Sequence, residues 1–196
     1  MNQYTAEHIE DFFNQYEKYI RYVIVAHTKH RPYAAYKEIG LFNQDKTNRY
    51  TQSKLEQTTK DLRHALNCFN KLLYPSSPNR PRQNPLLFRP LTFVTIEGAD
   101  VTLDRSKTIH VNIAMGNLPS ILSVEDVETL FKHAWYELAH QSQDVRAYDY
   151  GRVNDQSRWS GYSLKEAQQA PPKAWDTNSI WDVGNCWIPH TALKAD

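Results

Sequence analysis

Residues 107–116 carry two polar side chains whose types and spacing suit a divalent cation. Apolar residues occupy every second position: Ile109, Val111, Ile113 and Met115. His110, Asn112 and Ala114 alternate with them. This period of two predicts a β-strand with one face toward a core and an imidazole and a carboxamide side by side on the other. Imidazole suits Mn²⁺, Zn²⁺ or Fe²⁺ and an amide oxygen suits harder ions, so the pair can supply two ligands to one metal. A half-buried histidine beside a polar neighbour is the alternative interpretation.

The elements around this strand predict a mixed fold. Residues 91–97 are rich in β-branched and aromatic side chains and read as a strand that ends before Gly98. Ser123 and Asp126 predict a capping box that opens a helix ending near His140. Residues 144–150 alternate as a third strand, and residues 162–169 form a short helix stopped by two prolines. This order of strands and helices is βαβ-like, and we expect an α+β fold.

The first half of the chain reads as helical. Apolar residues at helical spacing predict one helix from Ala6 to about His27 and a second from Gln52 or Ser53 to about Tyr74. Residues 75–90 contain five prolines and three arginines, which predicts an exposed basic linker or a DNA-contacting loop. The expected organisation is an N-terminal helical region over 1–74, a linker over 75–90 and a further domain with a C-terminal tail over 91–196.

The order of these motifs resembles the HUH endonuclease superfamily, which includes rolling-circle replication initiators, relaxases and single-strand transposases. Those proteins have a motif-one strand, a strand with a His-hydrophobe-His metal motif and a later helix with Tyr-x-x-Lys. Here Leu91–Thr95, His110–Asn112 and Tyr162–Lys165 follow one another in that order, and the resemblance covers about residues 89–170. It implies the palm fold of that superfamily, an antiparallel sheet with flanking helices, extended by the N-terminal helical region.

The resemblance assigns roles to individual residues. It implies that Tyr162 is the nucleophile, with Lys165 on the same helical face to neutralise a phosphate oxygen or favour the phenolate. It implies Mn²⁺ or Mg²⁺ held by His110, by Asn112 in place of the second histidine, and by Glu97 after the motif-one strand. Asp100, Asp149 and Glu166 are further ligand candidates, whereas His133 and His140 are expected at the surface.

The implied activity is nicking and joining of single-stranded DNA, at an origin or hairpin, through a 5′-phosphotyrosine intermediate. One cation would polarise the scissile phosphate. DNA would lie on an exposed sheet face, and four residues near Tyr162 are candidates to bind it: Arg146, Tyr148, Arg152 and Arg158. Because no Gly-x-x-x-x-Gly-Lys motif is present, a helicase would be a separate protein.

Composition limits the alternatives. The net charge of +1 does not by itself indicate nucleic acid, but residues 1–99 carry 14 Lys and Arg against 9 Asp and Glu. The chain shows no apolar run of membrane-spanning length and no signal peptide, and its two cysteines fit a reducing compartment, so we expect a cytoplasmic protein without a membrane partner. Because Asn replaces the second histidine, a catalytically inactive DNA-binding or regulatory protein with the same fold is the first alternative. A protein-interaction module that uses the helical first half is the second.

Overall fold

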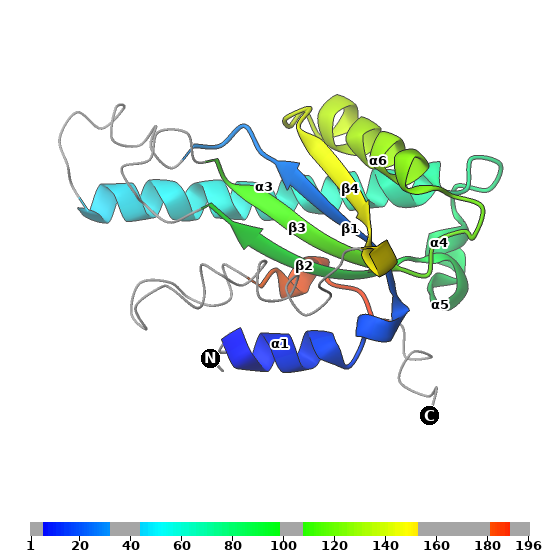
Figure 1. Cartoon of the computed structure of the whole chain (residues 1–196). Helices are drawn as coiled ribbons and strands as arrows, with labels where there is room; N and C mark the ends of the chain where they lie inside the picture. The colour runs from blue at the N-terminus through cyan, green and yellow to red at the C-terminus, as the bar shows by residue number, and fades with distance from the viewer. Residues whose placement is uncertain (1–5, 32–43, 99–107, 153–180, 189–196) are drawn as a thin grey trace.

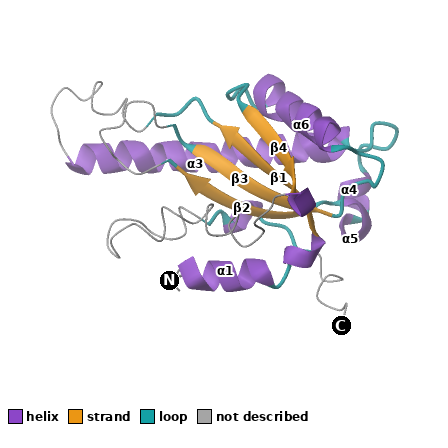
Figure 2. Ribbon diagram, in the orientation of Figure 1, coloured by secondary structure: helices purple, strands orange, loops and turns teal. Residues whose placement is uncertain are grey.

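A four-stranded antiparallel sheet with helices on both faces forms the centre of the molecule (Figure 1; Figure 2). The computed structural model describes residues 6–31, 44–98, 108–152 and 181–188. The strands are β1 (Ile20–His27), β2 (Leu91–Glu97), β3 (His110–Gly116) and β4 (Val145–Asp149). The sheet and its helices confirm the expected α+β class.

The strand order of the sheet is β2-β3-β1-β4. Helix α3 (Gln44–Leu72) connects β1 to β2, and α6 (Val124–Lys132) connects β3 to β4. Each of these β-α-β units is therefore split by a strand of the other unit, as in the ferredoxin-like β-α-β-β-α-β arrangement. This arrangement places β3, with its His-hydrophobe-Asn sequence, in the interior of the sheet between β1 and β2.

The predicted helix over residues 6–27 is wrong in its second half. Helix α1 covers Ala6–Asn14, the short 3-10 helix η1 covers Glu17–Tyr19, and β1 follows directly. Val23, Ile24 and Val25 are β-branched, which favours an extended backbone, and β1 gains hydrogen-bonded partners on both sides, β3 and β4. The first half of the chain therefore supplies an interior strand of the sheet, in addition to helices.

The second predicted helix is confirmed, although α3 begins at Gln44 rather than near Gln52. Its apolar stripe is buried against the sheet: Leu55, Leu62, Leu66, Phe69 and Leu73. Two short helices lie within the proline-rich segment, α4 (Arg80–Gln83) and α5 (Pro85–Phe88), each with a proline in its first turn. Proline is tolerated there because a first-turn N–H has no intrahelical acceptor.

The two faces of the sheet pack against different helices. Val111, Ile113 and Met115 of β3 join α3 and α6 in one apolar core, as the alternating sequence predicted. Ala114 joins Phe13 of α1 in the core on the opposite face. That opposite face also carries His110 and Asn112, because side chains alternate along a strand. All residues of β2 and β3 are buried, so the expectation of an exposed sheet face is wrong for these two strands.

The third predicted strand is present as β4, whereas the predicted helix over 162–169 lies outside the described residues. The capping box at Ser123 is present, and α6 continues as the π-helical turn η2 (His133–Leu138), which leaves His133 and His140 exposed as expected. The 3-10 helix η3 covers Tyr150–Arg152 and η5 covers Val183–Asn185. Residues Trp181 and Trp187 form single bridges to the outer edge of β2. None of the helices in the described ranges combines the length and apolar content needed to cross a bilayer.

Candidate functional site

Glu97, His110 and Asn112, the three predicted metal ligands, lie together at one end of the sheet. The Nε2 atom of His110 is 3.2 Å from Oε2 of Glu97, and Asn112 donates a hydrogen bond from Nδ2 to the same oxygen over 3.0 Å. Glu97 and Asn112 are fully buried, and His110 is 9% exposed. One carboxylate oxygen therefore faces both the imidazole and the carboxamide.

Strand register produces this convergence. Glu97 of β2 lies directly opposite His110 of β3, and Thr95 lies opposite Asn112. Directly opposite residues of an antiparallel pair point to the same face, so Glu97 reaches the His110 side chain from the neighbouring strand. Gly98 follows with a φ of +81°, a left-handed conformation in which the chain leaves β2 immediately after the carboxylate.

His110 meets hydrogen-bond acceptors at both ring nitrogens. Its Nδ1 atom is 3.3 Å from the carbonyl oxygen of Thr108, and its Nε2 atom faces Glu97. A neutral imidazole carries only one N–H, so it can donate to only one of these acceptors. Two arrangements give both ring nitrogens a partner. In one, an imidazolium donates to both acceptors; in the other, a neutral ring donates from Nδ1 while Nε2 binds a cation. The second arrangement is common in metal sites, where a ligating histidine donates its other N–H to a backbone carbonyl.

The donor set fits a hard or borderline divalent cation. A carboxylate, an imidazole and an amide oxygen suit Mn²⁺ or Mg²⁺ better than a soft metal. The Oδ1 atom of Asn112 is buried and has no hydrogen-bond partner in the structure, which makes it an unused amide-oxygen ligand. Within the described ranges, no group of three or more His, Cys, Asp or Glu side chains has the arrangement of a metal site. The candidate site therefore depends on the amide of Asn112.

His27 is a fourth member of this site that the sequence analysis missed. It lies opposite His110 on β1, and the two rings stack with their centroids 5.1 Å apart. Its Nδ1 atom is 2.7 Å from Oγ1 of Thr108, and its Nε2 atom is 3.9 Å from Asp144. Burial and the neighbouring His110 lower the pKa of His27, with Asp144 acting in the opposite direction. The signal in the sequence was the alternation Val23, Val25, His27, which the predicted helix concealed.

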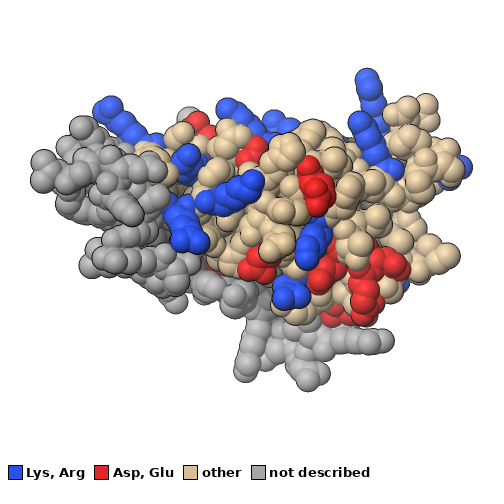
Figure 3. All heavy atoms as spheres, turned by 90° about the horizontal axis from the view of Figure 1, so that it is seen from above, with Lys and Arg blue, Asp and Glu red and all other residues tan. Residues whose placement is uncertain are grey.

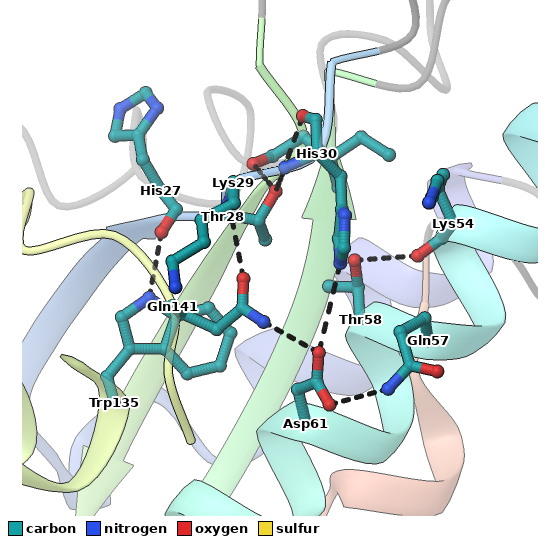
Figure 4. A network of polar contacts seen from close by, with 11 residues as sticks. His27, Thr28, Lys29, His30, Lys54, Gln57, Thr58, Asp61, Trp135 and Gln141 are labelled. Atoms are coloured by element: carbon teal, nitrogen blue, oxygen red, sulfur yellow. Dashed lines mark hydrogen bonds and ion pairs between the residues drawn. The ribbon is translucent and has the colours of Figure 1, made fainter. Parts of the chain in front are cut away.

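A polar network fixes the end of β1 that carries His27 (Figure 4). The indole N–H of Trp135 donates to the carbonyl oxygen of His27 over 2.8 Å. Gln141 accepts from the backbone N–H of Lys29 over 3.2 Å and donates to Asp61 of α3 over 2.7 Å. Figure 4 shows the imidazole of His27 directed away from these contacts. These hydrogen bonds hold the end of β1 against α3 and η2, while the His27 ring points to the sheet face that carries His110.

The predicted DNA-binding residues divide into two groups. Arg146 and Tyr148 of β4 lie opposite Val25 and Val23, so they share the sheet face of Asn112, and both are exposed. The guanidinium of Arg146 is 4.0 Å from Glu128. Arg152 ends η3, and its side chain lies outside the described part of the molecule. Arg158, Tyr162 and Lys165 also lie outside the described residues, as do the ligand candidates Asp100 and Glu166.

Asp149, another ligand candidate, does not join the site. It pairs with Tyr22, at the other end of β1 from His27. Paired residues of adjacent strands point to the same face, so Asp149 lies on the sheet face that packs against α3 and α6. Its carboxylate accepts a hydrogen bond from the backbone N–H of Gly151 over 3.1 Å. Asp149, the last residue of β4, therefore stabilises the turn that follows this strand.

Comparison of the chain with family models, curated proteins and solved structures finds no match. The resemblance to HUH endonucleases therefore rests on the order of the motifs, of which the described residues contain the β2 and β3 motifs. In the view of Figure 3, the Lys and Arg side chains of the described residues are interspersed with Asp and Glu.

Proposed function

We propose that this protein is a metal-dependent enzyme that nicks and rejoins single-stranded DNA in the manner of HUH endonucleases. A replication initiator of a plasmid, phage or other mobile element is the role that fits this activity. The supporting observation is the convergence of Glu97, His110 and Asn112 within hydrogen-bond distance on adjacent strands. A fully buried carboxylate is costly unless a positive charge or several donors balance it, and a divalent cation provides that balance.

The chain's own residues have distinct tasks in this proposal. Glu97, His110 and Asn112 hold Mn²⁺ or Mg²⁺, which neutralises charge on the scissile phosphate when bound. The phenol of Tyr162 gives its proton to water, and its oxygen attacks the phosphorus to form an O–P bond. The bond to the 3′-oxygen breaks, and that oxygen takes a proton and leaves as the 3′-hydroxyl. Lys165 stabilises the phenolate before attack. The released 3′-hydroxyl rejoins the strand by the reverse exchange, since one phosphate ester replaces another.

The exposed strand β4 offers a path for the DNA. Tyr148 is 48% exposed and can stack on a base, while Arg146 can contact a phosphate. The contact between Arg146 and Glu128 does not prevent this, because an exposed ion pair at 4.0 Å contributes little and is easily exchanged. Both side chains share the sheet face of the ligands, one strand beyond β1.

A catalytically inactive DNA-binding protein is the second candidate, and a specific observation favours it. His110 and Asn112 already contact the same carboxylate oxygen of Glu97, in a site with almost no solvent exposure. A closed network of this kind can stabilise the strand ends as a purely structural feature. The inactive protein would keep the DNA-binding side chains of β4 without metal binding or strand cleavage.

The decisive experiment follows a covalent adduct. Full-length protein is incubated with labelled single-stranded DNA in Mn²⁺ or in EDTA and then separated on a denaturing gel. We expect an adduct in Mn²⁺ that maps to Tyr162, and its loss in EDTA, in Tyr162→Phe and in His110→Ala. His133→Ala removes an exposed imidazole from η2 and serves as the matched control that keeps full activity.

Two results would contradict the enzymatic proposal. Equal cleavage in EDTA and Mn²⁺ would remove the metal from the reaction. Salt-sensitive binding of single strands without any adduct, across a library of random sequences, would favour the inactive protein. The library matters because the recognised origin sequence is unknown.

A further inference from the structure

A polar pocket of about 460 Å³ lies at the end of the sheet opposite to Glu97. The last turns of α3, the segment with α4 and α5, and Trp187 form its walls, and the two short helices lie beside the end of α3 in Figure 1. Arg89 of the pocket precedes β2, whereas Glu97 ends that strand. At about 3.3 Å per residue, β2 keeps the two regions roughly 20 Å apart. The pocket is therefore separate from the candidate metal site.

The pocket carries positive charge and hydrogen-bond donors. Its basic side chains are Lys71, Arg82 and Arg89, and its carboxamides are those of Asn67, Asn70 and Asn79. None of the described residues that line it carries a carboxylate. None of the three cations forms an ion pair with an acidic residue in the described part of the chain. The described lining therefore offers several donors to an anion and no competing negative side chain.

Arg89 is the best-placed of these cations. It is half-buried, and its guanidinium carbon is 4.2 Å from the centroid of the Trp187 ring. Burial lowers the pKa of Arg89, so an anion beside it would offset a desolvation cost already present in the fold. The C-terminal dipole of α3 opposes an anion here with roughly half a negative charge. Three full positive charges outweigh that term.

The walls of the pocket are held in place before any ligand arrives. Pro78, Pro81 and Pro85 restrict the backbone of the segment around α4. The backbone carbonyl of Asn79 accepts hydrogen bonds from the backbone N–H groups of Arg82 and Gln83 over 3.0 and 2.9 Å. Trp187 is fixed to Thr92 by two backbone hydrogen bonds of 2.8 and 2.9 Å. A preorganised site loses less conformational entropy on binding.

We propose that this pocket binds the phosphate group of a nucleotide, either a free nucleotide or one link of a single strand. Its volume lies within the range of roughly 300–1,000 Å³ that is usual for small-molecule sites. Arginine and lysine supply charge-assisted hydrogen bonds to phosphate oxygens, and the carboxamides can pair with the sugar or base. The inference extends beyond the proposed nicking activity and does not depend on it.

The test is calorimetric titration of the full chain with dTMP, inorganic phosphate and a short oligothymidylate. We expect Arg89→Gln and Lys71→Gln each to weaken nucleotide binding about tenfold, as lost hydrogen bonds to a charged group predict. Arg80→Gln is the matched control. Arg80 belongs to α4 but does not line the pocket, and its guanidinium carbon lies 5.3 Å from the centroid of the Phe88 ring. Its loss should therefore change the affinity for the nucleotide less than about twofold. Lys71 is exposed, so its variant will fold even if Arg89→Gln does not.

The outcomes separate the sources of the phosphate and the two proposals of function. Tight dTMP binding assigns the pocket to a free nucleotide, whereas binding of only the oligothymidylate, sensitive to Arg89 and Lys71, assigns it to a strand. Addition of EDTA, which would empty the candidate metal site, should leave nucleotide binding to the pocket unchanged, so failure of the metal site is distinguishable from failure of the pocket. Equal losses in Arg80→Gln and Arg89→Gln, absence of binding to all three probes, or inorganic phosphate bound as tightly as dTMP would overturn the proposal.

Discussion

Replacement of Glu97 by Gln tests whether the buried carboxylate serves a metal ion. Its Oε2 atom faces His110 and Asn112 at 3.2 and 3.0 Å, and hydrogen bonds to a charged group contribute about 1.5–3 kcal/mol each. Burying a carboxylate costs several kcal/mol, so the two terms nearly cancel without metal. We expect Glu97→Gln to change the free energy of unfolding in EDTA by no more than about 2 kcal/mol, in either direction.

With metal, the two proteins should differ. A ligand at one hundred times its Kd stabilises the native state by about 2.7 kcal/mol. For a chain of this size that corresponds to a rise in Tm of about 5–10 °C. We expect this rise for the wild type on moving from EDTA to Mn²⁺, and its loss in Glu97→Gln, because a carboxamide is a much weaker ligand than a carboxylate.

Thermal unfolding followed by circular dichroism measures both quantities. Glu137→Gln is the control, since it removes an exposed carboxylate from η2 and should keep the full metal-dependent rise. A wild-type Tm that is the same in EDTA, Mn²⁺ and Mg²⁺ would refute the metal site. A rise that persists undiminished in Glu97→Gln would show that the cation binds elsewhere.

Three further predictions concern stability. Burial lowers the pKa of His27 and of His30 in the folded state below the ordinary value of 6.5. Between the folded-state and ordinary pKa values the unfolded chain binds more protons, so the free energy of unfolding should fall as the pH drops below about 6.5. Urea titrations at several pH values measure this fall, which should be less steep in His30→Gln. Gly98 has a φ of +81°, and a Cβ added there would clash with the carbonyl oxygen of Thr108. Gly98→Ala should therefore lower the Tm by about 4–8 °C, and an unchanged Tm would contradict the described turn. Ser123→Ala removes the capping box of α6 and should cost about 1 kcal/mol, or about 2–4 °C in Tm, whereas Ser120→Ala, exposed and outside any helix, serves as its comparison.

The burial of the site affects how a DNA strand would reach it. β2 and β3 are buried along their whole length, while Tyr148 and Arg146 on β4 are exposed. His110, the first residue of β3 and 9% exposed, is the most exposed of the three candidate ligands. A phosphate would therefore approach from the His110 end of the strand, where His27 and Asp144 also lie.

Local patterns in the sequence determined several elements correctly. The alternation around His110 and Asn112 predicted the strand and its apolar face, and the β-branched run over 91–97 predicted β2. The Ser123 capping box predicted the start of α6 to the residue. These signals are local because they reflect side-chain period, rotamer restriction and hydrogen bonds between residues three apart. Glu97 was named from its place after motif one, and the structure brings it to His110.

Only the tertiary structure decided the conformation of residues 20–27 and the surroundings of the site. Apolar residues at 16, 19, 20 and 23 fit a helical period as well as the start of a strand, and pairing with β3 and β4 selects the strand. That choice places His27 over His110, a contact between residues 83 positions apart that no local period encodes. It also encloses the polar face of β3, because α1 and Trp181 pack on the same face of the sheet. Burial is a property of the assembled layers, so the sequence could name the polar pair on β3 but not how little solvent reaches it.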